Sequence, residues 1–145
     1  MIIKITLFLI IIILIILYTL YKFYNGDNIH KIYGKVVKTD KEKIKGLMHR
    51  KNRLGYNEGM LFPMGYKYNS MWMKNTYIPL DVIFLDDNMR ILGHIENTVP
   101  LSLESISIDK KSHNVLEMNS GSVKQFNMKI GDKIIFVENA LISLA

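Results

Sequence analysis

The strongest pattern in the chain is an apolar run near its first residue. Residues 5–21 carry no charge and almost no polar side chain, and one lysine flanks the run on each side. A helix needs about 20 residues, at about 1.5 Å each, to cross a hydrocarbon core roughly 30 Å thick. We therefore expect residues 1–24 to be a transmembrane anchor or uncleaved signal that contacts the membrane through residues 2–24.

Two other interpretations of this segment stay open. A cleaved signal peptide would need small residues at positions −1 and −3 of the cleavage site, and no such pair lies between Tyr18 and Gly26. A buried core helix is rarely apolar on every face. Polar residues 25–30 follow as a linker, so residues 31–145 are expected to form a single domain.

Beyond the linker, the pattern first predicts one strand and one helix. Residues 31–38 are rich in β-branched side chains, which favours a strand. Thr39 and Glu42 have the spacing of a capping box, and an apolar stripe then predicts a short helix over about residues 40–50.

The pattern in the remainder of the chain predicts short strands separated by turns. We expect residues 60–62 and 71–74 to form an antiparallel pair, and residues 80–85 and 90–96 to form a hairpin. Further strands are predicted at residues 114–119 and 133–137, with a helical turn at residues 123–127. The fold class is therefore mostly β with one or two short helices (α+β), built as a small antiparallel sheet or barrel behind the transmembrane helix.

The composition of the chain limits the classes of partner and of chemistry that we expect. The net charge is +6, but lysine outnumbers arginine by 16 to 3, a bias typical of an AT-rich genome. Lysine number is therefore a weak signal of membrane orientation. Basic and aromatic residues are not interleaved, so no nucleic acid is expected. The chain has no cysteine, which excludes disulfides and thiolate sites.

One cluster of polar and aromatic residues is the candidate ligand-binding site. Its members are Arg50, Trp72, Lys74, Asn75 and Asp81. Trp72 and Lys74 would share one face of a strand, with the indole as a platform and an ion pair to Asp81 orienting a small anionic, carbohydrate-like or peptide ligand. The structural alternative makes the same residues a salt bridge, a turn and a core tryptophan.

Several motifs resemble those of domain-of-unknown-function family 192. They are Gly46-Leu47-Met48-His49-Arg50, Glu58-Gly59-Met60-Leu61-Phe62, Trp72-Met73-Lys74-Asn75-Thr76 with Ile78-Pro79-Leu80-Asp81, Val115-Leu116-Glu117, and Gly131-Asp132. The resemblance covers about residues 32–138 and implies a compact β-rich fold, often behind an export signal or anchor, with no established reaction. His49 and Met71 depart slightly from the family pattern. The resemblance favours a single-pass protein of the cell (inner) membrane, with its domain on the extracytoplasmic side.

Three functions remain open from the sequence. The preferred one is a membrane-anchored, envelope-facing binding module. The first alternative is a hydrolase acting on envelope polymers with Glu58, Asp81 or Glu117 as acid or base, although Glu117 is expected to point outward from its strand. The second is a structural or assembly factor that recruits a partner through an edge strand. No histidine spacing predicts a metal site, and no phosphate loop predicts a cofactor.

Overall fold

The computed structural model describes residues 2–24, 26 and 28–139, and in the first helix it describes the side chains of residues 6–21. The elements in chain order are α1 (Ile2–Tyr24), β1 (Ile29–Val36), α2 (Asp40–Lys45), β2 (Glu58–Lys67), β3 (Ser70–Met71), β4 (Leu80–Leu85), β5 (Ile91–Ile95), β6 (Ile106–Ser107), β7 (Ser112–Asn119), α3 (Ser122–Gln125) and β8 (Lys133–Glu138). The mostly β fold expected from the sequence is confirmed.

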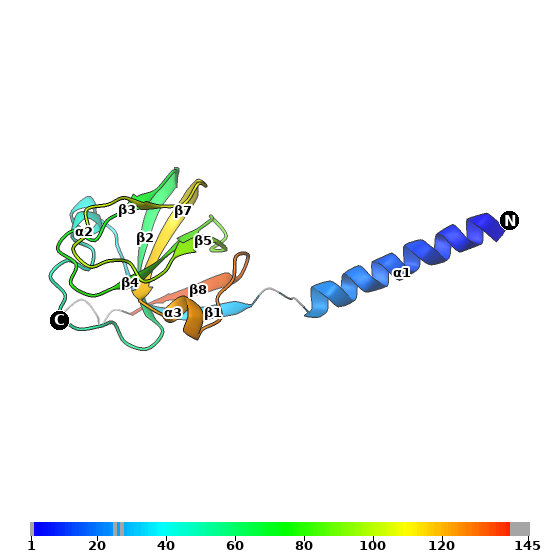
Figure 1. The fold of residues 1–145 in the computed structure, drawn as a ribbon, viewed down its shortest axis with the longest axis horizontal. Helices are drawn as coiled ribbons and strands as arrows, with labels where there is room; N and C mark the ends of the chain where they lie inside the picture. The colour runs from blue at the N-terminus through cyan, green and yellow to red at the C-terminus, as the bar shows by residue number, and fades with distance from the viewer. Residues whose placement is uncertain (1, 25, 27, 140–145) are drawn as a thin grey trace.

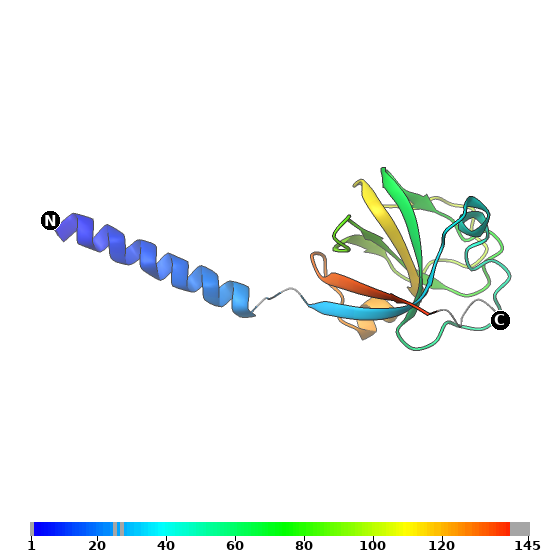
Figure 2. The same ribbon diagram turned by 180° about the vertical axis from the view of Figure 1, so that it is seen from behind.

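The main sheet is a curled half-barrel with the strand order β5-β4-β7-β2-β1-β8 (Figures 1 and 2). Strand β1 runs parallel to both β2 and β8, while the other neighbours are antiparallel. At one end the two outer strands approach each other, where Arg90 and Lys133 form a β-bridge and the Ile91 N–H donates to the Asp132 carbonyl (2.9 Å). The curl of the sheet therefore brings its two edge strands, β5 and β8, together at one end.

Most predicted strands are present, but one predicted pairing is wrong. The hairpin is β4 with β5, and the last two predicted strands are β7 and β8. Strand β2 pairs with β1 and β7 rather than with residues 71–74. Only Ser70–Met71 is extended in that region, and it pairs with β6 in a separate small sheet. The ten-residue β2 has partners on both sides in the main sheet, which leaves no edge for the predicted partner.

The two faces of the sheet bury separate apolar clusters. One face holds a cluster that includes Leu61, Leu116 and Ile134. The opposite face of β2, β4 and β7 holds a second cluster around Phe62 and Val115, and a third cluster lies beside it. The described residues of α2, β3, β6 and the connecting loops contribute to covering this second face (Figure 1). The central strands are consequently buried on both faces.

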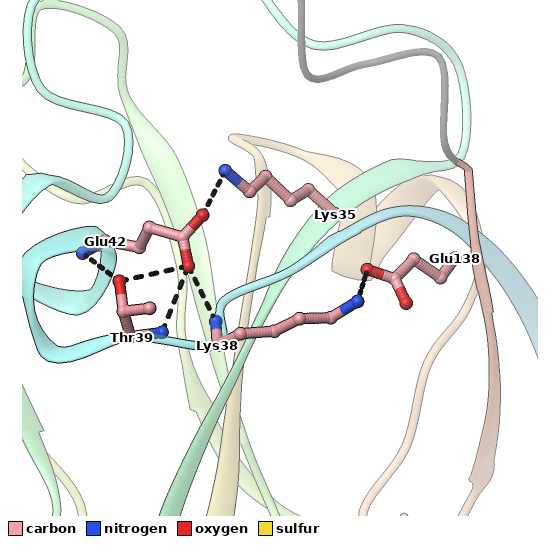
Figure 3. A network of polar contacts seen from close by, with 5 residues as sticks. All are labelled: Lys35, Lys38, Thr39, Glu42 and Glu138. Atoms are coloured by element: carbon pink, nitrogen blue, oxygen red, sulfur yellow. Dashed lines mark hydrogen bonds and ion pairs between the residues drawn. The ribbon is translucent and has the colours of Figure 1, made fainter.

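Helix α2 begins with the predicted capping box. The Glu42 N–H donates to Thr39 Oγ1 (3.2 Å), and the Thr39 N–H donates to Glu42 Oε2 (3.0 Å), as Figure 3 shows. Lys35 Nζ contacts the other Glu42 oxygen at 2.7 Å. Its hydrogen bond, followed by those from the Lys38 and Thr39 N–H groups, lowers the pKa of Glu42 to about 2. The helix ends at Lys45, earlier than predicted, because Gly46 turns the chain at φ 44°.

The apolar run at the beginning of the chain forms helix α1, which is 23 residues long. Almost all of its described apolar side chains are exposed, for example Leu7 at 58%. Among the residues whose side chains are described, no helix is long and apolar enough to cross a membrane. The transmembrane helix therefore stays a prediction.

Candidate functional site

A cavity of about 390 Å³ lies between α2 and the second face of the sheet. Its walls come from α2 and the turn after it, from β2, from β3 and the segment that follows it, from β7, and from the loop that leads into β6. The lining residues are Lys43, Ile44, Lys45, Gly46, Leu47, Met48, Phe62, Met64, Ser70, Met71, Trp72, Thr76, Leu103, Ser105 and Glu117. Most of the side chains in this lining are apolar, and Glu117 supplies its only carboxyl group.

Strand β7 places Glu117 at the wall of this cavity. In the register of the sheet, Glu117 lies opposite Met60 of β2 and Val82 of β4. Both strand neighbours are apolar, and the side chain is on the same face as Val115, which belongs to the second apolar cluster. The residue is 4% exposed.

No described residue forms a hydrogen bond or ion pair with the Glu117 carboxyl group. Burial alone raises its pKa from 4.5 to about 8, because the charged form loses its hydration and gains no partner. At neutral pH the group is therefore mostly protonated. A protonated carboxyl group can donate one hydrogen bond and accept others. Titratable groups with strongly shifted pKa values in clefts are often functional.

The expectation that Glu117 points outward is wrong. The alternation of apolar and polar residues predicts a strand with one solvated face, but β7 lies between β2 and β4 and is buried on both faces. The sequence does carry a signal for this, since Val115, Leu116 and Met118 make the strand an almost continuous apolar run. A single glutamate inside such a run indicates a buried carboxyl group.

Trp72 is the one member of the predicted cluster that lines this cavity. It follows β3 rather than lying on a strand, and it is 46% exposed. Lys74 Nζ lies 5.1 Å from the centre of the Trp72 ring, which is a cation–π contact. The two residues are thus neighbours, as predicted, but through this contact and not through strand alternation.

Arg50 belongs to a neighbouring groove of about 600 Å³. The groove shares Lys45, Gly46, Leu47 and Met48 with the cavity. Its basic lining residues are Lys35, Lys45, Arg50 and Lys51, and its one carboxylate is Glu42, which is paired with Lys35. The Arg50 Nε–H donates to the Asn52 carbonyl (3.0 Å). The five predicted residues therefore do not converge on one concavity.

Asn75 and Asp81 have structural contacts. Asn75 adopts φ 54°, and its carbonyl accepts the His49 N–H (2.8 Å). Asp81 is fully buried and accepts the N–H groups of Asn97 and Val123, each at 2.9 Å. Lys74 and Asp81, both described, form no ion pair, because both Asp81 oxygens are used inside the fold.

The other carboxyl group considered from the sequence lies outside the cavity lining. Glu58 accepts the Gly55 N–H within a tight turn. Among the described residues, no three His, Asp or Glu side chains gather into a cluster that could hold a metal ion. The chemistry of the cavity therefore rests on one buried acid, apolar walls and basic residues at α2.

The fold and the cavity define a small β-rich domain with an enclosed acidic group. The model of the family DUF192, described as "Uncharacterized ACR", matches residues 22–136. The chain belongs to this family, as its motifs indicate. None of the curated proteins compared gives a significant match.

Two crystal structures are similar to this chain. One, from Sinorhizobium meliloti 1021, is described as a "putative transcription regulator"; it is 35% identical, with 69% of this chain and 78% of that chain covered and a TM-score of 0.66. The other is a protein of unknown function from Novosphingobium aromaticivorans DSM 12444; it is 36% identical, with 69% of this chain and 71% of that chain covered and a TM-score of 0.65.

Proposed function

We propose that this protein is a small-ligand-binding domain held at a membrane by helix α1, with the domain on the extracytoplasmic side. The observation that carries the binding function is the cavity of about 390 Å³ with the unpartnered Glu117 carboxyl at its wall. Ligand pockets are typically apolar concavities of about 300–1,000 Å³ with a few polar groups that orient the ligand. The cavity matches this description in both size and lining.

Binding is favoured over hydrolysis by the placement of the carboxyl groups. A glycosidase uses two carboxyl groups that flank the scissile bond. Glu117 lines the cavity, whereas Asp81 is held by two backbone N–H groups and Glu58 by one. One isolated acid can orient a ligand but does not provide the pair.

The anchoring part of the proposal rests on the length and composition of α1. Its 23 residues extend for about 35 Å, against roughly 30 Å for the hydrocarbon core. The stretch with described side chains, residues 6–21, is shorter than the span needs, and the helix backbone extends beyond both of its ends. Exposed Leu, Ile and Phe side chains along this helix favour lipid as their surroundings.

The binding function can be tested by filling the cavity. Ser105 lines it and is exposed, so Ser105→Phe should occupy its space without disturbing the buried clusters. Ser107 lies two residues further on, is also exposed and does not line the cavity, so Ser107→Phe is the matched control. A fragment library is screened against the full chain by ligand-observed NMR, and fragments that bind the Ser107→Phe variant and the wild type should lose binding to Ser105→Phe.

The screen also separates the proposal from its alternatives. Fragments that bind all three proteins equally, or no bound fragment at all, would contradict the cavity as a binding site. In a pull-down, a protein recovered in stoichiometric amount with the wild type, Ser105→Phe and Ser107→Phe alike, with no ligand found for the cavity, would favour the assembly factor instead.

A further inference from the structure

We propose that the ligand of this cavity is a small amphipathic anion, with an apolar body among the walls, a hydrogen-bond acceptor facing Glu117 and an acidic group at the lysines of α2. This inference rests on the proposed binding function and names its ligand class. It follows from the apolar walls of the cavity, from the Glu117 carboxyl group and from the lysines of α2.

The walls require an apolar body. Phe62, Met64 and Met71 from the strands line the cavity together with Leu47 and Met48 from the turn after α2. Methionine side chains adapt to ligands of varied shape. Trp72 lies at the same cavity with nearly half of its surface exposed, so it can extend the apolar contact toward solvent.

Glu117 requires an acceptor on the ligand. Its strand neighbours, Met60 and Val82, provide none, and a neutral carboxyl group with no partner retains a free O–H donor. Leaving a buried polar group without a partner costs free energy, so a ligand carbonyl or ether oxygen that accepts this hydrogen would recover part of that cost. A ligand without an acceptor would leave it unrecovered.

The titratable side chains in the cavity lining determine the charge of the ligand. They are Lys43, Lys45 and Glu117, and the last is mostly neutral at pH 7. Lys43 lies 3.7 Å from Asp40, whereas Lys45 also lines the basic groove with Arg50 and Lys51. An acidic group at this rim is attracted by these cations, while a cationic ligand is repelled.

The position of the cavity in the fold indicates where the ligand comes from. The chain leaves α1, enters β1 at Ile29 and reaches α2 only after the far end of this strand. Eight strand residues extend for about 26 Å, and α2 and the start of β1 lie at opposite ends of the domain (Figure 1). The cavity beside α2 therefore lies at the end of the domain opposite the start of β1, and we expect its ligand to arrive from the aqueous phase.

The test uses matched probes on the full chain. The probes are 4-acetylbenzoate and 3-(4-acetylphenyl)propionate, which carry both a ketone and a carboxylate at two spacings. Their 4-ethyl analogues lack the ketone, and their primary amides lack the charge. Binding is followed by calorimetry and by the fluorescence of Trp72, the one tryptophan of the chain.

We expect at least one keto acid to bind about tenfold more tightly than its ethyl analogue and its amide. Glu117→Leu should lose this preference for the ketone, whereas Glu117→Gln, whose amide always donates, should keep it. Raising the pH from 6 to 9 should weaken keto-acid binding to the wild type about tenfold, and should leave binding to Glu117→Gln unchanged. Lys45→Gln should weaken the anions several-fold, with the exposed Lys41→Gln on the same helix as its control.

Other results would contradict the proposed ligand class and leave the proposed binding function of the cavity intact. Ethyl analogues that bind as well as ketones, or a Glu117→Leu variant that binds like the wild type, would remove Glu117 as a donor. Amides that bind as well as acids would remove the anionic group. In each of these cases Ser105→Phe would still abolish binding, whereas probes that are insensitive to Ser105→Phe would show that the cavity itself is not the site.

Discussion

Glu117 is a carboxyl group in the middle of an apolar strand, and its environment determines its chemistry. The residue is buried between Met60 and Val82, and burial raises its pKa to about 8. The folded protein therefore holds a proton at Glu117 that the unfolded chain releases above about pH 4.5. This difference links stability to pH.

The first prediction concerns that link. Because the folded state binds the extra proton, the free energy of unfolding falls as the pH rises from about 4.5 to about 8, and stops falling above it. Glu117→Gln removes this term, so the variant should be more stable than the wild type by a few kcal/mol at pH 9 and nearly equal to it at pH 4. Urea unfolding followed by Trp72 fluorescence measures both. The exposed Glu104→Gln serves as control, and an equal gain at both pH values would contradict the account.

The second prediction separates Asp81 from the binding site. Asp81→Ala leaves the N–H groups of Asn97 and Val123 without their acceptor inside the fold, which should cost about 3 kcal/mol. Asp87→Ala in the exposed hairpin turn should cost less than about 1 kcal/mol. Thermal unfolding compares the two. An Asp81→Ala variant of normal stability would show that the carboxylate has no structural role.

At the residue scale, the sequence patterns did not determine what the predicted site residues contact. Trp72 and Arg50 each line a concavity, as expected of binding residues, yet the two concavities are different. Asp81 was expected to form an ion pair that orients a ligand. Its contacts come from residues 97 and 123, which are distant in the sequence and which no local pattern connects to it.

At the scale of elements, the sheet depends on a close approach of two glycines. Gly34 of β1 is opposite Gly59 of β2, and a Cβ atom on Gly34 would lie 1.7 Å from the Gly59 carbonyl oxygen. The Gly59 backbone cannot move away from such a contact unless the two strands separate. The parallel β1–β2 pair, which links α2 and the cavity to the rest of the sheet, therefore requires glycine here.

The third prediction follows from this contact. Gly34→Ala should destabilise the domain by about 4 kcal/mol or more, or prevent folding. The exposed Lys31→Ala on the same strand should change the stability by less than about 1 kcal/mol. Urea denaturation of both variants provides the comparison. Near-normal stability of Gly34→Ala would mean that the two strands are further apart than described.

The local elements were largely predictable, and their pairing was not. The capping box of Thr39 and Glu42 and the β4–β5 hairpin are encoded by neighbouring residues, and both are confirmed. The parallel pairs of β1 with β2 and with β8 join residues that are 25 and 104 positions apart in sequence, and periodicity carries no information on such partners. The burial of both faces of β7 was missed because the strand was interpreted as alternating, although Val115, Leu116 and Met118 form an almost continuous apolar run.

At the scale of the whole molecule, we propose that α1 is a membrane anchor and that the cavity lies at the end of the domain opposite the start of β1. The fourth prediction is that the full chain stays with the membrane fraction after a carbonate wash, because the proposed anchor would insert about 20 apolar residues in lipid. A chain without residues 1–24 should appear in the supernatant with its domain folded. Release of the full chain by the wash would contradict the anchor, and retention of the shortened chain would point to another membrane contact.

The family and the β-rich class could be inferred from the chain as a whole, since the motifs extend over nearly all of the domain. The cavity could not, because its lining comes from six separate segments between residues 43 and 117. Only folding brings the turn after α2 over β2 and β7. Glu117 becomes an internal acid through that arrangement and not through its neighbours alone.

The most direct test of the central claim is an NMR titration of the Glu117 side-chain carboxyl carbon in the labelled full chain. The Glu117→Gln variant assigns the signal. The account predicts a neutral acid at pH 7 that ionises with a pKa of about 8. A carboxylate signal at pH 7 with an ionisation near the ordinary value of 4.5 would contradict it.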